Sequence, residues 1–186
     1  MAAFLNQLPA LIGVVVGVLG TLLTARLNDR AQWARAQSVR WDERRLEAYS
    51  EFGRALKEVA MLAHRLTATT RPHSRSLPID RQRGLELLAD ADVQRSKSWE
   101  GVLLLGDRDT VRAAREWRWA VTQLDRFARG VAAPDFDWAG AVHHVDECRD
   151  RFYAAARESL AMGGDDVAQA RWLVDRANVP GRAANP

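Results

Sequence analysis

The first apolar stretch of the chain is uninterrupted, because residues 8–25 comprise eighteen residues without a charge. At about 1.5 Å per residue, a helix of this length spans roughly 27 Å, close to the hydrocarbon thickness of a bilayer. A core helix of a soluble protein rarely runs this long without a polar face. The pattern therefore predicts a transmembrane anchor over residues 1–25.

The next segment, residues 26–45, is polar and basic, and we expect it to continue the anchor as a helical stalk. Arginines on this side only place it in the cytoplasm, with the N-terminus outside the cell membrane. A cleaved signal peptide is disfavoured, since Met1–Gln7 has no basic residue before the apolar core. The membrane-proximal basic residues, expected to lie near anionic lipid, are Arg26, Arg30, Arg35, Arg40, Arg44 and Arg45.

Beyond the stalk, apolar positions recur at spacings of three and four, as in amphipathic helices. The first stripe consists of Leu46, Tyr49, Phe52, Leu56, Val59, Ala63 and Leu66. Capping residues bound three further helices: Asp80 to Leu105, Asp107 or Asp109 to Gly130, and Asp137 to Gly163-Gly164. The last of these is expected to turn Ala141, Val145, Cys148, Phe152, Ala155 and Leu160 inward.

These elements predict an all-α fold. No stretch alternates with a period of two, so we expect no strands. Short connections between amphipathic helices favour antiparallel neighbours. The expected architecture is a single N-terminal transmembrane helix continuing into an antiparallel four-helix bundle with a short C-terminal helix at 165–176. The expected parts are the anchor (1–25), the stalk (26–45), a cytoplasmic bundle (46–178) and a flexible tail (179–186).

The distribution of charge along the chain argues against a nucleic-acid-binding protein. The chain has 27 basic and 24 acidic residues, and residues 26–45 account for its whole net charge of +3. A nucleic-acid-binding domain would carry a basic excess on its folded part, with a motif to match. Cys148 is the one cysteine, which excludes an internal disulfide and fits a reducing compartment.

The anchor carries small residues on one face. Such residues let two membrane helices approach closely, although chance matches to this pattern are frequent. The expected partners are therefore the lipid bilayer and either a second copy or another membrane protein. The candidate packing residues are Gly13, Gly17, Gly20, Thr21 and Thr24.

A histidine-rich segment suggests a metal site, through His143, His144, Glu147 and Cys148. Zinc requires three or four ligands, and Cys148 falls on the apolar stripe of its helix. Glu147 is better placed to pair with Arg151, four residues on. We therefore predict no metal and no cofactor.

The second bundle helix is apolar at both ends and polar in its middle. If that middle faced the bundle, Asp92 and Arg95 could form a buried pair lining a small polar cavity. A solvated face is the interpretation that the pattern favours. Trp33 and Trp41 on the polar stalk are candidate contacts to another chain, the alternative being a stalk that lies on the membrane surface. Trp119 lies either at the rim of the core or at a third such contact.

The sequence contains no phosphate-binding loop, nucleophile elbow or zinc-protease motif, so we do not expect an enzyme. The leading hypothesis is a membrane-anchored cytoplasmic scaffold or adaptor that oligomerises or recruits a protein partner at the inner leaflet. The alternative is a small-molecule sensor that uses a polar cavity in the bundle.

Two stretches carry a family resemblance. They are residues 21–52, where a small-residue anchor passes into arginines and then RRLEAYSEF, and residues 103–130, LLLGDRDTVRAAREWRWAVTQLDRFARG. Their layout resembles a group of uncharacterised single-pass membrane-anchored helical proteins of actinobacterial type. The resemblance implies a bacterial cytoplasmic membrane and assigns no functional residue.

Overall fold

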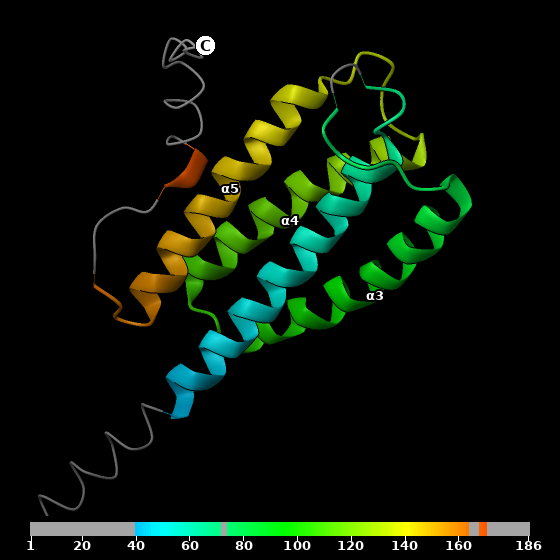
Figure 1. Ribbon diagram of the computed structural model, residues 1–186. Helices are drawn as coiled ribbons and strands as arrows, with labels where there is room; N and C mark the ends of the chain where they lie inside the picture. The colour runs from blue at the N-terminus through cyan, green and yellow to red at the C-terminus, as the bar shows by residue number, and fades with distance from the viewer. Residues whose placement is uncertain (1–39, 72–73, 164–167, 171–186) are drawn as a thin grey trace, which may run out of the picture. The chain divides into compact units, whose positions relative to one another are not determined.

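Four long helices contain most of the residues that the structure describes, and no strand occurs among those residues (Figure 1). The computed structural model describes residues 40–71, 74–163 and 168–170. The helices are residues 40–66, α3 (Arg81–Leu105), α4 (Arg108–Arg129) and α5 (Trp138–Ser159). The predicted all-α class and the helical bundle are therefore confirmed.

Aspartate caps begin three of these helices at the predicted positions. The side chains of Asp80, Asp107 and Asp137 each accept a hydrogen bond from the backbone N–H three residues on, at 2.8–3.0 Å. Each bond satisfies one of the N–H groups that a helix leaves without an internal partner. Gly130 ends α4 with a φ of 80°, a left-handed conformation that glycine adopts without steric cost.

Neighbouring helices run antiparallel, because the contacts between them join opposite ends. The start of the helix of residues 40–66 meets the ends of α3 and α5, and the start of α3 meets the end of α4. The contacts are Arg45 Nε to the Leu105 carbonyl (3.0 Å), Tyr49 Oη to Ser159 Oγ (3.2 Å) and Arg81 Nη1 to the Ala128 carbonyl (3.4 Å).

Aromatic rings from all four helices form the centre of the core. Phe52 is fully buried, and its ring centroid lies 5.3 Å from that of Phe152 on α5 and 5.9 Å from that of Trp117 on α4. Trp99 of α3 completes the group at 5.8 Å. Each ring removes a large apolar area from water, so this cluster contributes to the stability of the bundle and joins all four helices.

Two predicted boundaries were wrong: the start of the first apolar stripe and the end of the last bundle helix. Leu46, the first residue of the predicted stripe, is 50% exposed, because it lies six residues before Phe52 and therefore about 120° around the helix from it. The helix predicted to end at Gly163-Gly164 ends at Ser159 instead. The chain turns at Ala161, which has a φ of 51°, so the left-handed turn precedes the glycines.

The predicted anchor lies outside the described residues, as do most of the stalk, the short C-terminal helix apart from residues 168–170, and the tail. No helix among the described residues combines the length and the apolar character needed to cross a bilayer. The described residues from Arg44 onward belong to one compact unit, which contains the contacts between the helices.

Candidate functional site: the polar seams of α3

A network of four charged side chains joins the middle of α3 to α4. Asp92 lies 2.6 Å from the guanidinium of Arg95 and 2.7 Å from that of Arg129, and Arg129 lies 2.7 Å from Asp125. Arg95 also donates to Thr122 Oγ1 at 3.3 Å. The two positive and two negative charges balance, so the network joins the two helices without an excess of charge.

The interpretation of this stretch as a solvated face was wrong for its inward positions. Arg95 is 9% exposed and Ser98 is buried, whereas Gln94 and Ser96 are exposed. The buried positions of α3 run Leu88, Ala91, Arg95, Ser98 and Val102, with spacings of three and four. The helical period thus continues through polar residues, and this signal was available in the sequence.

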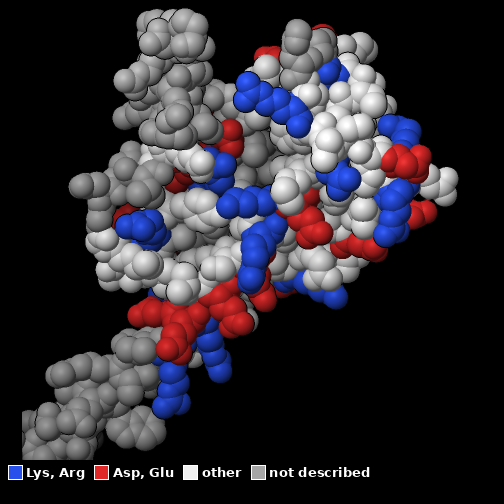
Figure 2. Space-filling model, in the orientation of Figure 1, with Lys and Arg blue, Asp and Glu red and all other residues white. Residues whose placement is uncertain are grey.

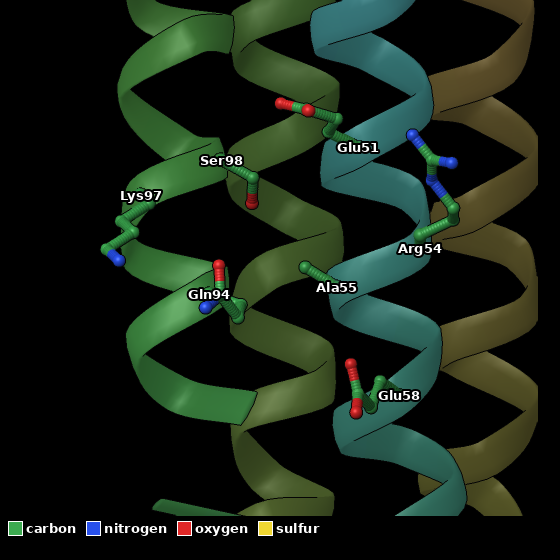
Figure 3. A pocket seen from close by; sticks show the side chains of 7 residues that line it. All are labelled: Glu51, Arg54, Ala55, Glu58, Gln94, Lys97 and Ser98. Carbon is green, nitrogen blue, oxygen red and sulfur yellow. The ribbon is translucent and has the colours of Figure 1, made fainter. Parts of the chain in front are cut away.

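Asp92 and Arg95 do form the pair that the alternative required, but they bind each other and α4. A groove lies beside them, between α3 and the helix of residues 40–66 (Figure 3). This groove has a volume of about 450 Å³. Its lining residues are Glu51, Arg54, Ala55, Glu58, Gln94, Lys97 and Ser98.

Small side chains make this groove. Ala55 and Ser98 are buried and form its floor, and Glu51 and Glu58 extend over it from the same helix (Figure 3). Ala55 lies four residues after Glu51 and three before Glu58, so all three share one helix face. Because its lining includes acidic, basic and amide side chains, the groove offers hydrogen bonds and both signs of charge to a polar molecule. Acidic and basic side chains are also interspersed on the face of the molecule that Figure 2 shows.

Most of the groove could not be predicted from the sequence, because its walls consist of ordinary surface residues on two helices far apart in the chain. Glu51, Glu58 and Lys97 form no ion pair with the other described residues. Exposed charges without partners carry no distinctive sequence pattern, and only the antiparallel docking of α3 brings the two walls together.

The histidine-rich segment of α5 forms local contacts. His143 Nε2 lies 3.3 Å from Glu147, and His144 Nε2 lies 3.6 Å from Cys148 Sγ. The predicted pairing of Glu147 with Arg151 was wrong: Arg151 lies 3.4 Å from Glu116 of α4 instead and donates to Cys148 Sγ at 3.0 Å. Within the described residues, no three His, Cys, Asp or Glu side chains are placed to hold a metal ion.

Cys148 is fully buried among the apolar residues of the core, as its position on the stripe predicted. Burial raises the pKa of its thiol, and the nearby guanidinium of Arg151 opposes that shift. The nucleophilic form of cysteine is the thiolate, so this environment favours an inert thiol.

A second titratable group, His64, lies where the helix of residues 40–66 meets α5. Its ring packs edge-on against Trp138 with centroids 5.1 Å apart, and the guanidinium of Arg71 lies 4.4 Å from the same indole. Burial lowers the pKa of His64, and the positive charge of Arg71 lowers it further. The neutral imidazole is therefore favoured, and His64 acts here as a packed aromatic ring.

Two of the three tryptophans predicted to contact a partner lie among the described residues. Trp119 is 61% exposed on α4, and Trp41 is 45% exposed. Trp33 lies outside the described residues, as do all five predicted packing residues of the anchor and Arg26, Arg30 and Arg35. Of the remaining basic residues, Arg40 and Arg44 are exposed, and Arg45 binds the Leu105 carbonyl.

In comparisons with known proteins, no family model, no curated protein and no solved structure matches this chain.

Proposed function

We propose that the protein is a non-enzymatic scaffold or adaptor, anchored by one membrane helix, that holds its helical bundle at the inner leaflet. The observation that carries this proposal is the abrupt change at residue 26, where eighteen uncharged residues give way to a segment with six arginines. The apolar run favours lipid, and the arginines favour the cytoplasmic side. The bundle then serves as a rigid body for presenting surface residues to partners.

Self-association through the anchor is the first expectation of this proposal. Replacing Gly13 and Gly17 with leucine (Gly13→Leu, Gly17→Leu) would separate two anchors that pack through their small-residue face. We expect the oligomer of the full-length chain in mild detergent, measured by light scattering, to dissociate to monomers. The matched control places leucine at Val14 and Val18, on another face. An oligomer that persists after the glycine substitutions would show that the anchor does not drive assembly.

A small-molecule sensor remains the second candidate, and the groove between α3 and the helix of residues 40–66 favours it. Its volume of about 450 Å³ lies within the range of ligand pockets, and its walls carry both signs of charge. Mass spectrometry of protein purified from native membranes distinguishes the candidates. A protein partner at a fixed ratio supports the scaffold, and a retained polar metabolite supports the sensor.

A further inference from the structure

The outward face of α4 carries a line of arginines with one tryptophan among them. At about 100° per residue, all five side chains fall within roughly 60° of the helix circumference, and the line extends for about 27 Å. All are exposed, and the tryptophan is 61% exposed. We call this set the α4 strip, and its members are Arg108, Arg112, Arg115, Trp119 and Arg126.

The charges of the α4 strip are largely uncompensated. Arg108, Arg115 and Arg126 form no ion pair with the other residues that the structure describes. Arg112 lies 2.9 Å from Asp109, but both side chains are about two-thirds exposed, and such surface pairs are weak. The strip therefore presents guanidinium groups that are available to an anionic partner.

The start of the strip is also hollowed. A depression of about 380 Å³ lies at the junction of α3 and α4, and Gly106 and Val111 are among the residues that line it. Its charged lining residues are three arginines of the strip, Arg108, Arg112 and Arg115, and one acid, Asp107, whose carboxylate accepts a hydrogen bond from the Thr110 N–H at the start of α4. A planar guanidinium pairs with phosphate oxygens through two parallel hydrogen bonds, so three of them around one depression suit a phosphate group.

We propose that the α4 strip binds the anionic phospholipid surface of the membrane, with phosphate groups against the arginines and the Trp119 indole at headgroup depth. This inference rests on the proposed function, because an anchored bundle meets the inner leaflet at a high effective concentration. Basic residues near an anionic leaflet contribute roughly fivefold each to binding, and tryptophan prefers the membrane interface. The bundle would then lie with α4 toward the lipid, leaving the groove beside α3 accessible.

The test uses the full-length chain in nanodiscs of phosphatidylcholine, with and without phosphatidylglycerol. A nitroxide label replaces the indole (Trp119→Cys in a Cys148→Ala background), and its collisions with a water-soluble relaxation agent report exposure. We expect the label to become several-fold less accessible in the anionic nanodiscs only, and high salt to reverse the change. A label at Lys97→Cys on α3 should stay accessible in both lipids.

Matched charge variants identify the residues responsible. Arg108→Gln, Arg112→Gln and Arg115→Gln together should abolish the protection, whereas Arg54→Gln, Arg75→Gln and Arg83→Gln, which remove the same charge elsewhere, should preserve it. A label at position 119 that is equally accessible in both lipids overturns the inference. The inference is also overturned if soluble polyglutamate, but not anionic lipid, protects this label from the relaxation agent. If the chain does not stay in the neutral nanodiscs, the anchor is disproved. The accessibility of the label at position 119 in anionic nanodiscs would still test the α4 strip on its own.

Discussion

Replacing Phe52 with alanine is expected to lower the free energy of unfolding by about 3–5 kcal/mol, the usual cost of removing a buried phenyl ring and leaving a cavity. The Phe52 ring contacts aromatic side chains from the three other helices, so its loss would loosen all of them together. Urea titration of the full-length protein in detergent micelles, followed by circular dichroism, measures this change.

The matched control for Phe52→Ala is Leu104→Ala. Leu104 is 83% exposed near the end of α3, so its truncation should change stability by no more than about 0.5 kcal/mol. Equal effects of the two substitutions would contradict the core as described here, because burial is what distinguishes the two side chains.

Replacing Arg129 with methionine is expected to lower the free energy of unfolding by about 2 kcal/mol. The substitution leaves Asp125 and Asp92 without the guanidinium that joins them, and the Asp125 side chain is only 8% exposed. Breaking a fully buried pair costs about 3–5 kcal/mol, and we expect less here because Arg129 and Asp92 are about 30% exposed and partly screened by water.

A second substitution tests the electrostatic cause of that loss. Arg129→Met leaves Asp125 without an ion-pair partner among the described residues, whereas Asp92 keeps Arg95 at 2.6 Å. Adding Asp125→Asn removes that unpaired carboxylate and should recover about half of the lost stability, a coupling that a double-mutant cycle detects. Arg112→Met is the control, because its partner Asp109 is exposed and the pair contributes little. Strictly additive effects of the two substitutions would show that the network does not act as a unit.

The helices of the bundle could be predicted because their signals are local. Capping aspartates at residues 80, 107 and 137 each act on the backbone three residues on, so their effect does not depend on the rest of the fold. The end of α5 could not be placed, because Ala161 takes the turn that the nearby glycines are better suited to adopt. No local rule predicts that choice.

The candidate site was harder to predict because its parts are tertiary. The position of Arg95 could have been read from the three-four spacing, but its partners Thr122 and Arg129 belong to another helix. The groove over Ala55 and Ser98 exists only once α3 has docked. The α4 strip, in contrast, is a sequence pattern of arginines three, four and seven residues apart, but this pattern belongs to no cofactor or metal motif.

The claim on which the proposed function depends is that residues 8–25 lie permanently in lipid, and alkaline carbonate extraction of membranes that contain the full-length chain tests it most directly. High pH strips proteins held by charge alone, whereas a spanning helix of about twenty residues stays in the bilayer. We predict that the chain remains in the membrane pellet after extraction. Recovery of the intact chain in the supernatant would contradict the anchor.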